Sequence, residues 1–133
     1  MDWERRIERF LDGAPHAVVG ASHDRRKYGN KVLRAFLQTG RKVYAINPHV
    51  DEVEGLETCA SLADLPEAVH GISLITPPEV TEGIVEQAVK LGIQHIWMQP
   101  GAESDAAIAR AEAAGANVIA GGPCVLVALQ FRE

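Results

Sequence analysis

The sequence has few of the features that mark secreted, membrane-embedded or nucleic-acid-binding proteins. Its only cysteines, Cys59 and Cys124, are too few for the disulfide framework of a small secreted domain. Its apolar runs are strand-sized, shorter than the roughly 20 residues that cross a bilayer. The net charge of -5 offers no broad basic surface for nonspecific nucleic-acid binding, and no segment resembles a signal peptide. These absences predict a cytoplasmic protein with no membrane span and no nucleic-acid partner.

What remains is an ordinary globular composition, with 47% hydrophobic and 23% charged residues. A chain of 133 residues is the size of one domain with its own core, so residues 1–133 are expected to form a single domain. No repeat, low-complexity segment or linker interrupts the chain. The five histidines lack the spacing of metal ligands, and we expect no metal site.

Hydrophobic periodicity alternates between strand-like and helix-like segments along the chain. Strands are predicted at residues 17–19, 43–46, 72–75, 94–97 and 117–119. Helices are predicted at residues 2–11, 28–39, 78–91 and 104–114, with a short helical turn at 61–65. The apolar tail, residues 124–131, fits either a strand or a short helix. The alternation predicts an α/β fold, a Rossmann-like doubly wound three-layer sandwich with a mainly parallel sheet.

The first predicted strand ends at Gly20-Ala21-Ser22, shortly before a predicted helix. Small residues at this position let backbone N–H groups approach a phosphate at the helix N-terminus. The turn is not a complete G-x-G-x-x-G fingerprint, and glycine also punctuates loops in any α/β domain. By itself the turn is a weak indication of a nucleotide-type ligand.

Positive charge follows this turn closely. The side chains that carry or can carry it are His23, Arg25, Arg26, Lys27, Lys31 and Arg34. Such a cluster near a helix N-terminus favours a ligand with several phosphates. The alternative is a solvated basic face that balances the acidic residues Asp51, Glu52, Glu54 and Glu57.

The turns after the other strands carry small, rigid or amide-bearing residues and hardly any carboxylate. They are Asn47-Pro48, Thr76-Pro77-Pro78, Met98-Gln99-Pro100-Gly101 and Gly121-Gly122-Pro123-Cys124. Because the carboxyl ends of parallel strands share one edge of a sheet, these turns are expected to line one crevice. Neutral groups suit the binding of an anionic ligand better than acid–base catalysis. Thr76 and Glu79 also have the spacing of a capping box for the helix that follows.

The end of the second strand lacks a residue that NAD-binding domains usually have. In those domains an aspartate or glutamate at this position binds the ribose 2′-hydroxyl. This chain has Asn47 there, followed by Pro48. The sequence therefore predicts a Rossmann-like fold without the expected NAD recognition.

Several short motifs occur in a characteristic order over nearly the whole chain. They are Val18–Ser22, Lys27–Val32, Val43–Pro48, Gly55, Ser61–Pro66, Thr76–Pro78 and Trp97–Ala102. Together they resemble the small stand-alone CoA-binding-domain proteins, whose fold is similar to the N-terminal domain of the succinyl-CoA synthetase alpha subunit. The order of the motifs is a far more specific signal than any one of them.

The resemblance implies coenzyme A bound across the strand ends, with no catalytic residue assigned. It places Gly20, Ala21 and Ser22 at the phosphates, with Lys31 or the Arg25-Arg26 pair near a phosphate group. It places Asn47 and Pro48 beside the nucleotide portion. It assigns the middle of the crevice to Thr76, Pro77 and Pro78, and its far wall to Met98, Gln99 and Gly101. On this basis Gly20→Val is expected to block the ligand while leaving the protein folded.

Three functions stay open at this point. The resemblance favours a protein that binds CoA or an acyl-CoA as a carrier, sensor or regulatory module without chemistry of its own, as a homodimer or with a partner enzyme. An NAD(P)-dependent oxidoreductase would need a proton donor, and no carboxylate–histidine or tyrosine–lysine arrangement is evident. A subunit of an acyl-CoA ligase would need a phosphorylatable histidine on a further domain. Cys124 is either a buried inert thiol or a neighbour of the pantetheine thiol.

Overall fold

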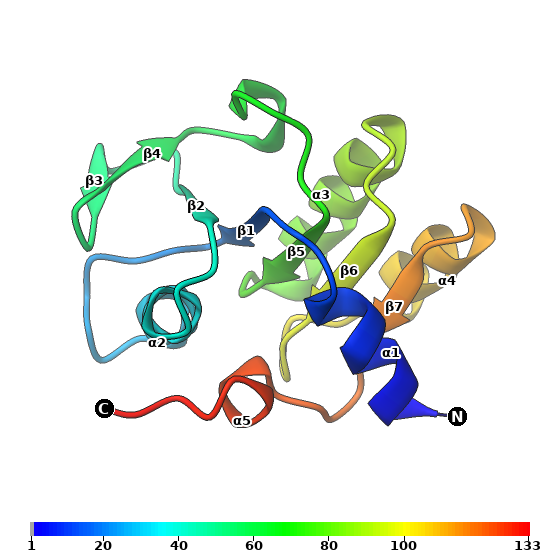
Figure 1. Ribbon diagram of the computed structural model, residues 1–133. Helices are drawn as coiled ribbons and strands as arrows, with labels where there is room; N and C mark the ends of the chain where they lie inside the picture. Colours follow the sequence, from blue (N-terminus) through cyan, green and yellow to red (C-terminus); the bar gives the residue numbers. More distant parts are fainter. Residues whose placement is uncertain (1) are drawn as a thin grey trace.

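A seven-stranded sheet forms the centre of the molecule in the computed structural model, which describes residues 2–133 (Figure 1). The strands are β1 (His16–Val19), β2 (Val43–Ile46), β3 (Glu52–Val53), β4 (Leu56–Cys59), β5 (Gly71–Leu74), β6 (His95–Met98) and β7 (Asn117–Ile119). Their order across the sheet is β3-β4-β2-β1-β5-β6-β7. All neighbouring pairs are parallel except β3 with β4. The Rossmann-like prediction is confirmed.

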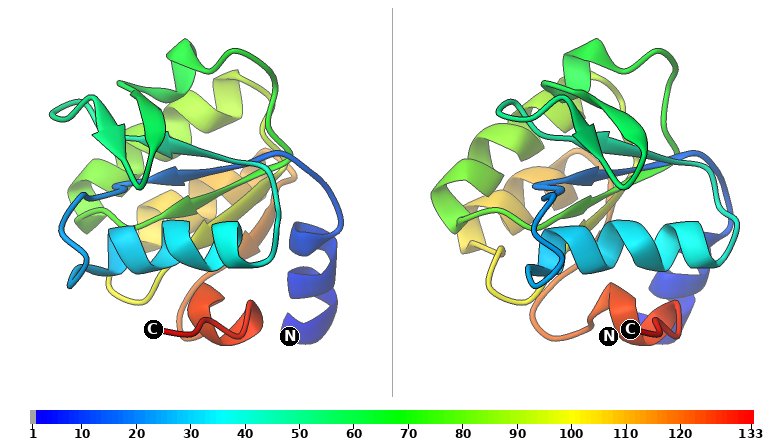
Figure 2. Two further views of the ribbon diagram at one scale, coloured as in Figure 1. Left: turned by 60° about the vertical axis from the view of Figure 1, so that its left-hand side comes forward. Right: turned by 90° about the vertical axis from the view of Figure 1, so that its left-hand side faces the viewer.

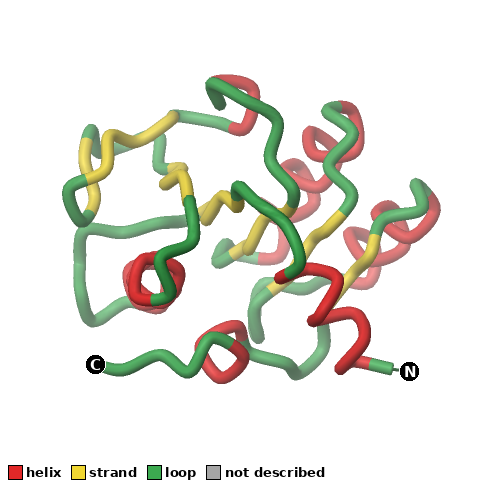
Figure 3. Tube along the Cα trace, viewed as in Figure 1, coloured by secondary structure: helices red, strands yellow, loops and turns green. Residues whose placement is uncertain are grey.

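Helices cover both faces of this sheet (Figures 1 and 2). One face carries α3 (Pro78–Lys90), α4 (Asp105–Ala113) and the 3-10 turn η1 (Leu62–Asp64), and the opposite face carries α1 (Trp3–Leu11), α2 (Tyr28–Gln38) and α5 (Val125–Ala128). Alternate strand residues point to opposite faces, so Ala17 and Val19 join the core under α3 while Val18 joins the core under α2. Figure 3 shows the strands enclosed between the two helical layers.

The predicted strands and helices are present, with ends displaced by at most one residue. α1 and α4 begin within one residue of their predicted starts. Asp2 and Ser104 are their N-cap residues, and each side chain accepts a hydrogen bond from the backbone N–H group three residues further along the chain. The capping box predicted for α3 is wrong. Pro77 occupies the N-cap position, so Thr76 lies one residue before the position from which it could cap the helix. The Thr76 hydroxyl instead forms a hydrogen bond with the Thr81 hydroxyl at 2.6 Å. The open tail contains the short helix α5.

The hairpin of β3 and β4 was not predicted from the sequence. Its two-residue turn is Glu54-Gly55, with φ of 50° and 81°. Asparagine or aspartate usually precedes glycine in such turns, so glutamate gave no hairpin signal. β4 pairs in parallel with β2, which extends the sheet and brings the loop after Cys59 to the same edge as the loops after β1 and β2.

Three histidines lie at the opposite edge, at the amino ends of β1, β5 and β6. His16 is fully buried and bonds through Nε2 to the Phe10 carbonyl at 2.8 Å, while Nδ1 has no partner among the described residues. The rings of His70 and His95 stack with their centroids 4.2 Å apart. Burial, followed by nearby positive charge, lowers the pKa of both His16 and His95 to about 4. The environment at this edge therefore favours the neutral forms of His16 and His95.

Candidate ligand-binding groove at the strand ends

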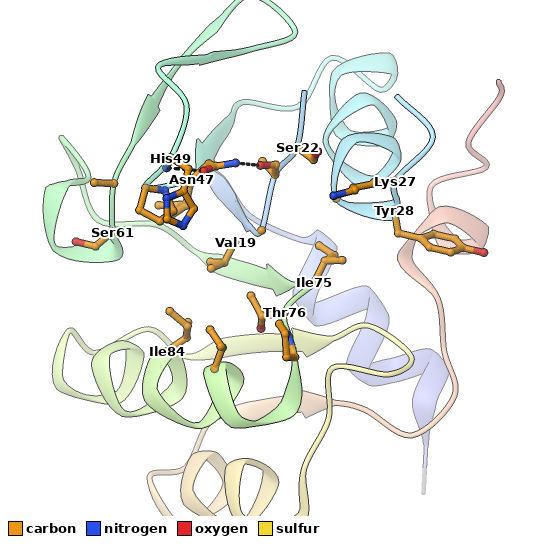
Figure 4. Close-up of a pocket in the computed structure, with 18 of the residues that line it drawn as sticks. Val19, Ser22, Lys27, Tyr28, Asn47, His49, Ser61, Ile75, Thr76 and Ile84 are labelled. Carbon is orange, nitrogen blue, oxygen red and sulfur yellow. Dashed lines mark hydrogen bonds between the residues drawn. The ribbon is translucent and has the colours of Figure 1, made fainter. Parts of the chain in front are cut away.

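A groove of about 780 Å³ opens at the carboxyl ends of β1, β2 and β5 (Figure 4). β1 lies between β2 and β5 in the sheet, so the chain turns to opposite sides of β1 at this point. Ligands of open α/β sheets bind at such topological switch points, where the loops diverge and leave a crevice. The walls are the loops after these strands, the start of α2, the loop after β4 and one face of α3.

Two glycines bring the first turn close to its neighbours. Gly20 has a φ of 94°, and a Cβ at this position would overlap the carbonyl oxygen of Ile75. A Cβ on Gly29, in the first turn of α2, would overlap the carbonyl oxygen of Gly20. The turn is thus held between the loop after β5 and the helix α2. A side chain at Gly20 would displace the backbone of a neighbouring loop, so Gly20→Val is now expected to destabilise the fold as well as block the ligand.

The start of α2 brings positive charge to the groove. Lys27 is the N-cap residue of α2 and lines the groove. Figure 4 shows its side chain pointing from α2 toward the groove, whereas the Tyr28 ring points away. No carboxylate is among the lining residues of the described chain. The groove therefore combines an ammonium group, the N-terminus of a helix and a glycine turn, which together favour an anionic ligand.

Asn47 joins the loops after β1 and β2. Its Nδ2 donates to the Ala21 carbonyl at 2.7 Å, and its Oδ1 accepts from the His49 N–H at 2.7 Å (Figure 4). Both ends of the amide are used within the protein. An aspartate could not donate to Ala21, so the position that reads ribose in NAD-binding domains has a structural function in this chain.

Asn47→Asp is therefore expected to lower the free energy of unfolding by about 1–3 kcal/mol, because a carboxylate oxygen would face the Ala21 carbonyl without a proton between them. Urea unfolding at pH 7 measures the loss. Gln94→Glu is the matched control, since it adds the same charge at an exposed side chain. Equal stability of the two variants would show that the Asn47 bridge does not hold the loops.

A second layer of polar groups supports the loop between β1 and α2. The buried Asn30 donates through Nδ2 to the Ser22 carbonyl at 2.8 Å and to Glu54 at 3.1 Å. Arg34 donates through Nε to Asn30 Oδ1 at 2.6 Å and through its terminal nitrogen to the Arg25 carbonyl at 3.1 Å. These bonds fix the path of residues 22–25. No sequence pattern indicates this function of Asn30.

The residues predicted for the site fall into four groups in the structure. Seven of them line the groove: Gly20, Ala21, Ser22, Asn47, Pro48, Thr76 and Pro77. Gln99 and Gly101 line a smaller cavity that shares Ile75, Thr76 and Pro77 with the groove. Met98 is fully buried and Pro78 is the first residue of α3, and neither is among the lining residues of the groove or of the smaller cavity. Arg25, Arg26 and Lys31 lie together in a separate recess.

Other lining residues were not assigned individually to the site from the sequence, although Lys27 belongs to the basic cluster that was predicted to favour phosphates. They include Lys27, Tyr28, His49, Ser61, Val80, Ile84 and Gln87. The spacing of Val80, Ile84 and Gln87, with Pro77, places them on one helical face, and this spacing could have indicated them. Ser61 could not be found because it follows β4, a strand that the sequence pattern did not reveal.

Cys124 is half-buried, and its sulfur lies 3.3 Å from the Gln99 Nε2 atom. It lines a third cavity together with Tyr28, Ile75, Gln99 and Pro100. Tyr28 and Ile75 also line the groove, so the two spaces adjoin. Among residues 2–133, no three histidine, cysteine or acidic side chains are placed to hold a metal ion, and no helix has the length and apolarity to cross a membrane.

The sheet order and the groove define a Rossmann-like domain of the kind that binds nucleotide-type ligands at its switch point. Comparison with known protein families is more specific. Residues 15–130 match the family described as the CoA binding domain, and the chain belongs to this family.

Individual relatives agree with this membership. A conserved hypothetical protein from Pyrococcus furiosus is 39% identical, with a TM-score of 0.80 over 85% of this chain and 97% of that one. Acetyl-coenzyme A synthetase 1 of Ca. Korarchaeum cryptofilum is 31% identical, with a TM-score of 0.74 over 84% of this chain and 27% of that one. The alpha subunit of the ADP-forming acetate–CoA ligase II of P. furiosus is 25% identical over 68% of this chain and 20% of its own length. The chain spans only 11–20% of the first curated ligases that it matches.

Proposed function

We propose that the groove binds coenzyme A or an acyl-CoA, and that the domain acts as a carrier, sensor or regulatory module without chemistry of its own. The observation that carries this proposal is the combination of the glycine turn, the N-terminus of α2 and Lys27 in a groove without carboxylates. The fit of the two glycines supports it, because side chains at Gly20 or Gly29 would displace the backbone around the turn. Membership of the CoA binding domain family supports coenzyme A as the ligand class.

In this proposal the backbone of Gly20, Ala21 and Ser22 holds the phosphates, and Lys27 donates to one of them. Asn47 and Pro48 border the nucleotide portion, and Thr76 and Pro77 form the middle of the groove. The pantetheine arm continues past Ile75 toward Gln99 and Gly101, which line the adjoining cavity. Met98 is fully buried and Pro78 begins α3, so neither is proposed to contact the ligand.

A second candidate is a component of an acyl-CoA ligase. The observation in its favour is that relatives of this chain include parts of acetate–CoA ligases. Such an activity would require further domains or a partner enzyme, because the groove has no acid–base pair of its own. The groove lining contains Lys27, Tyr28 and His49 as its titratable side chains.

Calorimetric titration with CoA, acetyl-CoA, dephospho-CoA, NAD and NADP in one buffer tests the proposal. We expect CoA or acetyl-CoA to bind most tightly and NAD weakly, because Asn47 provides no carboxylate for a ribose. A preference for NAD or NADP would overturn the proposal and support an oxidoreductase. Weak binding of all five ligands would leave the groove without the proposed function.

Lys27→Met is expected to weaken CoA binding by roughly 10- to 100-fold, the value of one charge-assisted hydrogen bond to a phosphate. Lys90→Met is the matched control, because Lys90 is exposed at the far end of α3 and lies outside the described groove lining. Calorimetry measures both variants. Equal affinities of the two variants would place the phosphates away from the start of α2.

A further inference from the structure

The last residues of the chain run beside α2 (Figure 2). A further cavity, of about 340 Å³, lies between Glu133 and the α2 region. Its lining residues are Arg25, Arg26, Lys31, Arg34 and Glu133, and none of them lines the groove. We call this cavity the basic recess. Four of its five lining side chains are cationic, so the recess is an anion-binding environment by composition.

Arg34 is the fixed centre of the basic recess. Its side chain is only 9% exposed, which is rare for arginine and requires that the charge be compensated. Three of its five N–H donors are accounted for among the described residues, by Asn30, the Arg25 carbonyl and Glu133. The guanidinium is therefore held rigidly by two groups of the α2 region, with donors still available to a further acceptor.

The Glu133 carboxylate occupies the recess. Its Oε2 accepts from Arg34 at 3.2 Å, and its Oε1 lies 3.5 Å from Lys31 Nζ. Partial desolvation raises the pKa of Glu133, but the bond from Arg34 and the charges of Arg34 and Lys31 outweigh it and hold the pKa below its usual value. One negative charge is thus shared between two cations, which leaves positive charge uncompensated.

Contacts other than the carboxylate seat the tail. The Gln38 amide bonds to both the carbonyl and the N–H of Arg132, at 2.6 and 3.0 Å. The Phe131 ring lies 5.1 Å from the Arg34 guanidinium carbon. The Glu133 side chain itself is 64% exposed, so it can rotate out of the recess without breaking these contacts.

We propose that the basic recess is a second anion site, separate from the groove, which Glu133 fills in the unliganded protein and which takes a phosphate group when Glu133 rotates out. A phosphate dianion matches the two positive charges of Arg34 and Lys31, which a single carboxylate does not. Its additional oxygens can accept from the donors of Arg34 that remain free.

The neighbouring charges define which cations are available. Arg26 pairs with Asp24 at 3.0 Å, and Arg25 lies 3.5 Å from Glu54. Arg34 and Lys31, in contrast, have Glu133 as their only acidic partner among the described residues. Removing the charge of Glu133 is the most direct way to free the site.

Titration of the full chain with inorganic phosphate, followed by ¹H–¹⁵N NMR, tests the site. We expect saturable shifts at the Arg34 Nε–Hε group and the Lys31 amide, and Glu133→Gln should tighten phosphate binding by roughly fivefold, since it removes a competing charge. Lys31→Met should weaken it by a similar factor. Glu57→Gln is the matched control, because it makes the same charge change at an exposed residue outside the recess.

Equal effects of Glu133→Gln and Glu57→Gln would overturn the proposal, since they would show a general charge effect. Shifts confined to the amides of Gly20–Ser22, or no saturable shift at the recess in any variant, would also overturn it.

The phosphate group can belong to a free small molecule or to the ligand of the groove. Competition with CoA and dephospho-CoA distinguishes these sources. If CoA removes the phosphate-induced shifts at Lys31 and dephospho-CoA does not, the 3′-phosphate of CoA is the occupant. If phosphate stays bound in the presence of either ligand, the occupant is a separate molecule.

Discussion

Gly29→Ala is expected to destabilise the protein by about 3 kcal/mol and to abolish CoA binding, although the substitution adds one methyl group to a helix. The reason is that the new Cβ would overlap the Gly20 carbonyl oxygen, a backbone atom that cannot rotate away. α2 would have to move away from the turn, and the phosphate-binding geometry would be lost with the contact. Urea unfolding and calorimetric titration measure the two effects.

Gly83→Ala provides the opposite control. Gly83 is also inside a helix, α3, but a Cβ there would meet no atom within 4 Å. Alanine should therefore stabilise the helix by up to about 1 kcal/mol, through the lower backbone entropy of the unfolded chain. If Gly29→Ala behaved like Gly83→Ala, the turn and α2 would not be in close contact, and the groove as described would be wrong.

Acidification is expected to destabilise the protein well above the pH at which carboxylates titrate. The pKa of His16 is about 4 in the folded protein against 6.5 for a free side chain, so the unfolded chain binds more protons between these values. Stability is then fully present above pH 6.5 and falls as the pH drops toward 4. One histidine contributes about 1.4 kcal/mol per pH unit, or about 3 kcal/mol over this range.

His16→Phe should make this dependence shallower without removing it, because the pKa of His95 is also lowered to about 4. The ring packs between Phe10 and Phe36, with centroid distances of 4.9 and 5.1 Å, so phenylalanine fits the site. It loses the bond to the Phe10 carbonyl, at a cost of about 1 kcal/mol near pH 7, but cannot be protonated. His23→Gln, at an exposed position, should keep the steep profile. Identical slopes in the two variants, measured by urea unfolding from pH 7 to pH 4.5, would contradict this account.

The regular part of the fold could be predicted because each of the five predicted strands is a short, mainly apolar run and each long helix has a distinct boundary. The hairpin of β3 and β4 could not, since its strands are short and Glu54 adopts a positive φ that its sequence does not indicate. The capping box failed for a local reason, the additional proline at position 77. Hydrophobic periodicity locates helices and strands, but it does not show that a second proline moves the N-cap of α3 by one residue.

The site shows the same division. The loops that line the groove could be predicted from strand ends, because topology alone brings them together. The separation of Lys27 from Arg25, Arg26 and Lys31 could not, because it depends on how residues 22–25 turn before α2. That turn is fixed by Asn30 and Arg34, whose bonds to backbone carbonyls leave no mark in a sequence pattern. Neighbours in sequence therefore line different cavities.

The groove lacks carboxylates although the chain as a whole is acidic, and this contrast affects how an anionic ligand approaches the groove. The chain carries a formal net charge of -5, so when a polyphosphate comes within about one Debye length, about 10 Å, the overall field repels it rather than steering it inward. Attraction begins only at the rim, where Lys27 and the start of α2 are near. Capture is then governed by short-range contacts after random encounter, and added salt would screen the distant repulsion as well as the local attraction.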